Sequence, residues 1–306
     1  AALFGVHPSH AFTSVETSPE YADRPRLNVL KKAGVSRVSI GIQSFQDEEL
    51  KAIKRRPRQN TIYQALDDIR QMDFPYFNID LIYGIKGQTV ESFLYSLEEA
   101  LRFQPNELFI YPLYVRQGTG ITEREPDDVC FRMYRAACKL LQAKGFLQTS
   151  MRRFIHHPST DAEVSCGDEV MLSCGSGGRS YLGDLHYATR YTVCQQCIAR
   201  EIDEYMATTD FTVARNGFIL SAKEQQQRFI IKNLMYYMGI DKAEYTRRFG
   251  EPLDRTPLFR QLAEQYWIEE TPERIRLTPE GLGYSDYIGQ LFITPEIRQL
   301  METYSY

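Results

Sequence analysis

Four polar residues close to the ends of apolar stretches are the first candidates for chemistry in this chain. They are Glu16, Gln43, Asp80 and Tyr114, and each belongs to a different stretch. Carboxylates accept hydrogen bonds from hydroxyl and ammonium groups, whereas a glutamine amide both donates and accepts them. If the fold brings these side chains together, they form a binding site for a polar ligand.

The elements that would position them alternate between strand and helix. Short apolar runs with a period of two predict strands, and longer runs with helical spacing predict helices. The expected strands are 12–15, 37–42, 77–82 and 108–115, and the expected helices are 47–55, 60–72, 91–103 and 127–144. Strands that alternate with helices at these lengths predict a parallel sheet with right-handed crossovers.

A parallel barrel would gather the four strand ends on one face, where barrel enzymes place their active sites. Four strands cannot close such a barrel, so either the sheet is open or earlier strands are missing. We therefore predict an α/β fold that contains the last four strands of a partial (β/α)6 barrel in residues 1–125.

A second pattern begins near residue 221. Three helical segments precede two short strands at 267–269 and 274–277, and Thr278-Pro279-Glu280 has the residue types of a helix start. Three helices followed by a two-stranded wing predict a winged-helix-like α+β domain over 221–306. Residues 126–220 are expected to be a connecting region associated with the barrel, with a glycine-rich turn.

Composition restricts the partners of this chain. With 306 residues, 43% hydrophobic and 25% charged, it has the composition of an ordinary globular protein and lacks an apolar run of membrane-spanning length. The net charge is −4, and residues 221–306 hold 11 basic and 13 acidic side chains, without a basic recognition stripe. We therefore expect a cytoplasmic protein that binds neither nucleic acid nor a membrane surface.

The sequence does not predict a framework of disulfides. Six occur, at 130, 138, 166, 174, 194 and 197. In a chain of this composition without a leader segment, reduced thiols or metal ligands are expected more than disulfides. Cys194 and Cys197 have the spacing of a metal knuckle and could form a zinc or auxiliary cluster site with Cys166, Cys174 or His156 and His157; buried thiols on a helix are the alternative.

Several motifs in order resemble one family. They are Glu16-x-x-Pro19, Gly41-Ile42-Gln43-Ser44-Phe45, an arginine (Arg55) twelve residues after Gln43, Asn78-Ile79-Asp80-Leu81-Ile82-Tyr83-Gly84, and Gln88-Thr89-x-Glu91-Ser92. Together they resemble the oxygen-independent coproporphyrinogen III oxidase (HemN-type) family of radical S-adenosylmethionine enzymes. The resemblance covers about 12–115 and about 220–290.

The resemblance implies two cofactors, S-adenosylmethionine and a [4Fe–4S] cluster held by Cys-x3-Cys-x2-Cys. It places Glu16, Gln43, Arg55 and Asp80 at the positions that contact S-adenosylmethionine, with Tyr114 contributing through its backbone and Arg179 in the glycine-rich turn. The implied chemistry is formation of a 5′-deoxyadenosyl radical that abstracts hydrogen from a porphyrin-like or other organic substrate. An electron donor such as flavodoxin or ferredoxin would be a partner.

The sequence departs from the family pattern in two places. The three-cysteine motif is absent and no cysteine precedes residue 130, so we expect the cluster ligands upstream of Ala1 and the chain as given to be inactive without them. A homologue that kept the fold and lost the chemistry is the alternative. The Arg-Asn-Phe-Gln-Gly-Tyr segment of the oxidase and the His-Asn-x-x-Tyr-Trp segment of the haem chaperone are also absent, which leaves the substrate open.

Four further residues are candidates for substrate contacts. Arg152, Arg153 and Arg179 could hold carboxylate groups, with solvated surface arginines as the alternative. His186 could donate a proton or contact a porphyrin, with a hydrogen-bonded structural histidine as the alternative. The prediction is thus a radical S-adenosylmethionine oxidoreductase of the HemN type; the alternatives are a radical methyltransferase on the same scaffold and a non-catalytic haem-binding carrier.

Overall fold

The chain forms two compact units in the computed structural model, which describes residues 11–56, 58–116, 118–156, 170–190, 192, 194–253 and 257–303. The first unit contains Ala1–Val115 and Ile121–Ala162, and the second contains Arg116–Gly120 and Glu163–Tyr306. The expected division at 125 and 220 differs from this grouping, because the segment after 125 contributes a helix and two strands to the first unit. The predicted division into segments 1–125, 126–220 and 221–306 stays a prediction.

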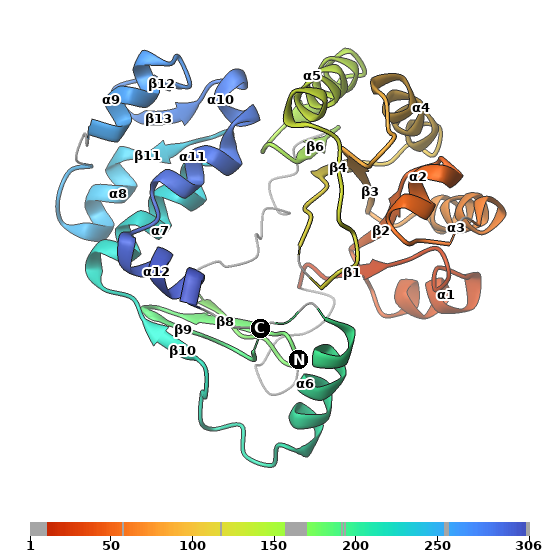
Figure 1. Ribbon diagram of the computed structural model, residues 1–306, viewed down its shortest axis with the longest axis horizontal. Coiled ribbons are helices and arrows are strands. Elements are labelled where there is room, and N and C mark those ends of the chain that lie inside the picture. The colour runs from red at the N-terminus through yellow and green to blue at the C-terminus, as the bar shows by residue number, and fades with distance from the viewer. Residues whose placement is uncertain are drawn as a thin grey trace. The chain divides into compact units, whose positions relative to one another are not determined.

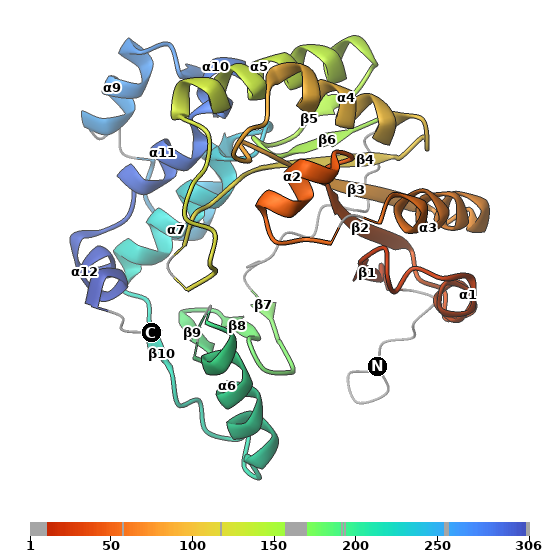
Figure 2. The same ribbon diagram turned by 45° about the vertical axis from the view of Figure 1, so that its right-hand side comes forward.

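The first unit is built around one six-stranded sheet (Figures 1 and 2). Its elements in chain order are β1 (Ser14–Thr17), α1 (Arg24–Lys32), β2 (Arg37–Gln43), α2 (Asp47–Ala52), α3 (Gln59–Met72), β3 (Tyr76–Tyr83), α4 (Val90–Leu101), β4 (Glu107–Pro112), α5 (Asp127–Ala143), β5 (Leu147–Gln148) and β6 (Arg153–Ile155). The strand order is β1-β2-β3-β4-β6-β5.

The four expected strands and their helices are confirmed. Strands β1 to β4 pair in parallel, as strand–helix alternation predicts. Strands β6 and β5 were not predicted from the sequence, and they add to β4 in antiparallel register. Helix α1 was also missed; Asp23 caps it through the backbone N–H of Arg26, and Pro25 lies in its first turn. The described sheet is consistent with a partial barrel, and closure into a barrel stays a prediction.

Alternation along the strands separates an apolar face from a polar face. Val38, Ile40 and Ile42 of β2 are at most 2% exposed and pack into the core with the helices. The same parity holds in the neighbouring strands, where the buried residues are Phe77, Ile79, Leu81, Leu108 and Ile110. Because successive side chains point to opposite faces, the residues between them lie on the other side of the sheet. That side, called the polar face below, carries the candidate site.

The second unit begins with a small antiparallel sheet that the sequence did not predict. It contains β7 (Val170–Met171), β8 (Arg179–Leu182), β9 (Leu185–Ala188) and β10 (Gly217–Ile219), in the order β10-β9-β8-β7, and α6 (Gln195–Ala207) lies between β9 and β10 in the chain. Hydrogen bonding of the Gly175 N–H to the Tyr205 hydroxyl connects the glycine-rich turn before β8 to α6.

The remainder of the second unit has the predicted winged-helix pattern. It comprises α7 (Ala222–Leu234), β11 (Ile240–Asp241), α8 (Lys242–Phe249), α9 (Pro257–Glu264), β12 (Ile268–Glu270), β13 (Arg274–Leu277), α10 (Pro279–Gly283), α11 (Ser285–Leu291) and α12 (Pro295–Thr303). The wing strands form a sheet of order β11-β13-β12 over a separate apolar core. Thr278 caps α10 as expected, accepting the N–H of Gly281. None of the helices in the described ranges is sufficiently long and apolar to cross a membrane.

Candidate functional site

The polar face of β1–β4 brings three of the predicted residues onto one sheet. Across the strands, Glu16 is in register with Ser39, Ser39 with Asn78, and Gly41 with Asp80. Gln43 ends β2 on the same side of the sheet. The site therefore consists of two carboxylates and an amide on three adjacent parallel strands.

Asp80 is the most strongly perturbed acid of this face. The Asn78 side-chain amide donates to Asp80 Oδ1 at 2.7 Å, and the Ser39 hydroxyl donates to Oδ2 at 3.3 Å. The pKa of Asp80 is raised to about 6, mainly by removal from water and also by Glu16, while Asn78, Arg37 and Ser39 oppose the rise. Asp80 is therefore a carboxylate held in place by neutral donors, and it accepts further hydrogen bonds near neutral pH.

Gln43 reaches the site through an unusual backbone. Its φ is 72°, in the left-handed region that few residues other than glycine adopt, and the register with β3 shifts between Gly41 and Gln43. This bulge turns the side chain back over β2, so that a Cβ atom on Gly41 would lie 2.5 Å from Gln43 Nε2. Gly41 is thus the residue that leaves room for the amide beside Asp80. Strain of this kind is characteristic of functional sites.

A buried glutamate that the sequence did not single out holds the two loops behind the site. Glu49 of α2 is 5% exposed, and it accepts hydrogen bonds from Ser44 Oγ at 2.6 Å, Gln88 Nε2 at 2.9 Å and Ser92 Oγ at 2.5 Å. Ser44 follows the Gln43 bulge, and Gln88 also accepts the N–H of Gly84 at 2.7 Å. Glu49 therefore fixes the chain where β2 and β3 end, and the Gln88-Thr89-x-Glu91-Ser92 motif supplies two of its three donors.

The opposite end of the polar face carries an ion cluster. Glu107, at the start of β4, accepts from Arg37 Nε at 2.7 Å and from Arg153 Nη2 at 2.5 Å. The side chain of Glu107 is 3% exposed and those of the arginines are 17% and 14% exposed. Arg153 is thus used within the fold, against the expectation that it could hold a substrate carboxylate.

Aromatic residues from β4 complete the face. Phe109 and Tyr111 alternate with the buried residues of the strand and stack at 5.8 Å between ring centroids. Burial and the nearby carboxylates Asp80 and Glu16 raise the pKa of the Tyr111 hydroxyl, which stays protonated at neutral pH. Tyr111 was not predicted from the sequence, although its parity in the strand could have identified it.

Three predicted residues lie outside this group. Tyr114 is 46% exposed beyond the end of β4, and its hydroxyl accepts from Arg152 Nη2 at 2.6 Å. Arg55 lies after α2 with an exposed side chain. Arg179 begins β8 in the second unit, where Ser173 donates to its carbonyl oxygen. The predicted contacts of these three residues with S-adenosylmethionine stay a prediction.

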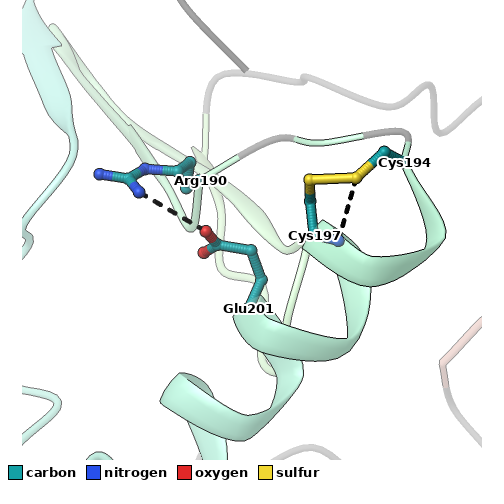
Figure 3. Close-up of a disulfide and its surroundings, with 4 residues drawn as sticks. All are labelled: Arg190, Cys194, Cys197 and Glu201. Atoms are coloured by element: carbon teal, nitrogen blue, oxygen red, sulfur yellow. Dashed lines mark hydrogen bonds and ion pairs between the residues drawn. A yellow bond between two sulfur atoms is a disulfide. The ribbon is translucent and has the colours of Figure 1, made fainter. Parts of the chain in front are cut away.

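The cysteine expectations need one correction. Cys194 and Cys197 form a disulfide at the start of α6, whereas reduced thiols were expected, and in this state neither is a metal ligand (Figure 3). Cys130, Cys138 and Cys174 are free, and Cys166 and His157 lie outside the described residues. No group of three metal-ligating side chains occurs within the ranges that the structure describes. The two-residue spacing predicted proximity; it did not predict whether the sulfurs bind a metal or each other.

His186 lies among rings in the small sheet of the second unit. It stacks on Tyr181 at 4.2 Å and meets Phe218 edge-on at 5.3 Å, and its Nε2 atom is buried without a hydrogen-bond partner. Burial lowers its pKa, and Arg228 and Arg179 lower it further. The alternative of a hydrogen-bonded structural histidine is therefore only half right: the ring is packed, but Nε2 is not hydrogen-bonded.

Comparisons with known proteins agree with this arrangement. The sequence profile of the Radical SAM superfamily matches residues 3–100, and that of the HemN C-terminal domain matches residues 220–283. The chain is 26% identical over 295 residues to the heme chaperone HemW of Bacillus subtilis, covering 91% of this chain and 76% of that protein. It is 25% identical over 291 residues to the oxygen-independent coproporphyrinogen III oxidase of Thermostichus vulcanus, covering 88% and 89%.

A solved structure supports the fold. Coproporphyrinogen III oxidase (HemN) from Escherichia coli, described as a radical SAM enzyme, matches with a TM-score of 0.75 and 21% identity over 94% of this chain and 70% of that one. The two profiles therefore place residues 3–100 in the Radical SAM superfamily and residues 220–283 in the HemN C-terminal domain family, and the solved structure shows that the chain shares the fold of that protein.

Proposed function

We propose that the polar face of β1–β4 binds S-adenosylmethionine, and that the protein is a radical SAM enzyme acting by hydrogen abstraction on a porphyrin-like or other organic substrate. The observation that supports this most directly is the placement of Asp80. It is held by Asn78 and Ser39 and is in register with Gly41, over which the Gln43 amide is turned, with Glu16 two strands away on the same face.

The superfamily uses S-adenosylmethionine and a [4Fe–4S] cluster. The polar face fits the first of these. Carboxylates accept hydrogen bonds from ribose hydroxyls and from an ammonium group, and the Gln43 amide matches donors and acceptors of an adenosyl ligand. Asn78 Oδ1 is buried without a partner, which leaves one acceptor of this face unused. Arg55 is proposed to pair with the methionyl carboxylate.

The cluster does not fit the described residues. It needs three thiolates on one short loop. The first unit offers Cys130 and Cys138, which both lie on α5. Burial raises the pKa of both thiols, that of Cys138 to about 11, so neither favours the thiolate form. The described residues therefore supply no ligand set for the cluster.

The chain's own residues bind and orient the cofactor in this proposal. When bound, S-adenosylmethionine supplies the adenosyl group that the superfamily converts into a radical. Asp80 and Glu16 accept hydrogen bonds from its polar groups, and Gln43 sets its position along β2. Phe109 and Tyr111 provide an apolar wall of stacked rings that excludes water from one side.

Titration calorimetry of S-adenosylmethionine into the purified chain tests the site. Asp80→Ala is expected to weaken binding by roughly tenfold to hundredfold, since a hydrogen bond to a charged group contributes about 1.5–3 kcal/mol. Glu98→Gln, on an exposed position of α4, is the matched control and should bind as the parent chain does. Equal affinities for Asp80→Ala and Glu98→Gln would contradict the site.

The reaction outcome is part of the proposal. Hydrogen abstraction with loss of carbon dioxide, as in a coproporphyrinogen oxidase, produces 5′-deoxyadenosine, and a flavodoxin or ferredoxin would supply the electron. A radical methyltransferase would instead transfer a methyl group to the substrate. Product analysis in a chain that carries the cluster ligands distinguishes the two.

A haem-binding carrier is the second candidate, because relatives of this chain include proteins named heme chaperone HemW. Titration of haem into the purified chain, followed by the Soret absorbance, tests it. Saturable binding of one haem per chain without turnover of S-adenosylmethionine would favour the carrier.

A further inference from the structure

The disulfide between Cys194 and Cys197 joins two residues of the same helix start (Figure 3). Stabilisation by a disulfide grows with the length of the chain that it closes, and here the cysteines are only three residues apart. The bridge also connects no second element to α6. It is therefore poorly suited to a structural role.

Cys194 occupies the N-cap of α6, where its sulfur accepts the backbone N–H of Cys197 at 3.1 Å. The helix has 13 residues, and no acidic side chain lies in its first turn to offset the positive end of the helix dipole. Exposed N–H groups and the dipole favour a thiolate over a thiol at this position. After reduction, Cys194 would therefore be the more reactive sulfur.

An unusual carboxylate lies one turn after Cys197. The side chain of Glu201 is 11% exposed, and its Oε1 atom is buried without a hydrogen-bond partner. Its one ion-pair contact in the described chain is a long one, 3.8 Å to Nη1 of Arg190, which is 52% exposed. Residues four apart on a helix share a face, so Glu201 lies on the same face of α6 as Cys197, and its carboxylate is directed at Arg190 (Figure 3).

We propose that Cys194, Cys197 and Glu201 form a thiol–disulfide exchange site that reacts with a dithiol, separate from the polar face of β1–β4. A thiolate of the dithiol attacks Cys194 Sγ, the bond to Cys197 breaks, and Cys197 leaves with the electron pair and takes a proton from water, which Glu201 relays. The second thiolate of the dithiol then attacks the other dithiol sulfur, which is bonded to Cys194 in the mixed disulfide. Cys194 is released as a thiolate. Two electrons pass from the dithiol to the pair, and the dithiol leaves as a disulfide.

In the reverse direction, Cys194 attacks a disulfide and Glu201 accepts the proton of Cys197 as that sulfur closes the bridge. Glu201 acts through Cys197 and is a positioning and proton-relaying residue of this site. Its substitution should slow the exchange without removing either sulfur.

Exchange with reduced and oxidised dithiothreitol tests the proposal on the intact native chain. Site-specific alkylation followed by peptide mass spectrometry reports Cys194 and Cys197 separately from the other thiols. We expect the bridge to open and close reversibly without denaturant. Once reduced, Cys194 should react with iodoacetamide at pH 7 roughly tenfold faster than the exposed free Cys174, as expected for a thiol with a lowered pKa.

Variants of α6 separate the role of Glu201 from a general effect of charge. Glu201→Gln should slow reduction by dithiothreitol by about tenfold or more, as for loss of a general acid–base group, while the exposed Asp203→Asn should leave the rate unchanged. Equal rates for the two variants would overturn the role of Glu201. A bridge that opens only after unfolding, thiols that oxidised dithiothreitol leaves reduced, or metal bound to them would overturn the exchange site.

Discussion

At the scale of single residues, the site depends on Asp80 being ionised where ionisation is costly. Its pKa is raised from 3.8 to about 6, mainly by loss of water. When folding raises the pKa of a carboxyl group, the group stabilises the folded state most at pH values below its unfolded pKa. This stabilisation is lost as the pH rises through the folded pKa. The charge that would bind the ligand thus weakens the fold near neutral pH.

Asp80→Asn should therefore separate stability from binding. Between about pH 4 and pH 6.5 we expect the melting temperature of the parent chain to fall relative to the variant, because only the parent acquires the buried charge. Binding of S-adenosylmethionine at pH 7.5 should be weaker in the variant. Thermal melts across the pH range measure the first effect, and parallel pH profiles for the two chains would show that Asp80 is not the titrating group.

Gly41 is the second residue whose identity follows from the geometry. A methyl group there would approach the Gln43 amide to 2.5 Å, so Gly41→Ala should displace that amide from its position beside Asp80. We expect ligand affinity to fall several-fold while unfolding changes by only about 1 kcal/mol, within the usual range for single substitutions. Calorimetric binding and urea unfolding of the same variant measure both. If Gly41→Ala binds as the parent chain does, the Gln43 amide is not a ligand contact.

At the scale of elements, α2, α4 and the loops after β2 and β3 are joined by one buried carboxylate. Glu49 has three neutral donors and little contact with water, so replacing either carboxylate oxygen with an amide nitrogen sets a donor against a donor. This network joins two sequence motifs that lie far apart in the chain: Ser44 comes from one motif, and Gln88 and Ser92 come from the other.

Glu49→Gln should lower the free energy of unfolding by about 2–3 kcal/mol, the cost of a buried donor or acceptor left unsatisfied. The neighbouring Glu48→Gln is the control, because the Glu48 side chain is 86% exposed and pairs with Lys51 on the surface. Urea unfolding followed by circular dichroism measures both. A similar small effect for the two variants would indicate that the Glu49 network contributes little.

Strand parity made much of the first unit predictable. Val38, Ile40 and Ile42 alternate with smaller or polar residues, and this pattern identified β2, but it did not reveal the bulge that turns the Gln43 side chain over the polar face. The sequence did not reveal Glu49, because an acidic residue early in a helix is expected for the helix dipole alone. Strands β7 to β10 are two to four residues long, too short for periodicity to identify, and the partner of each cysteine depends on a helix position that spacing does not specify.

At the scale of the whole molecule, the two units have distinct buried cores. The core of the first includes Ile40, Ile79 and Leu108, whereas that of the second includes Leu234, Ile240 and Ile288. The one tryptophan of the sequence, Trp267, stacks on Tyr284 in the second unit at 4.7 Å. Its fluorescence therefore reports the second unit.

This separation leads to a prediction about cooperativity. Glu49→Gln should move the unfolding transition seen by circular dichroism to lower urea and leave the transition seen by Trp267 fluorescence near its parent value, because only the first core is weakened. Both probes recorded on the same samples measure this. Coincident shifts would instead show that the two cores unfold as one cooperative unit.

The ion cluster at the start of the strands has a consequence for which nucleotides the site accepts. Arg37, Glu107 and Arg153 leave one positive charge at the amino end of the polar face, whereas Glu16 and Asp80 place two carboxylates two residues further along their strands. Adenosine phosphates share the adenosyl group of the proposed ligand but carry negative charge, which the two carboxylates repel. The polar face would therefore bind the abundant nucleotides of the cell weakly and would favour an adenosyl cation bound in one orientation.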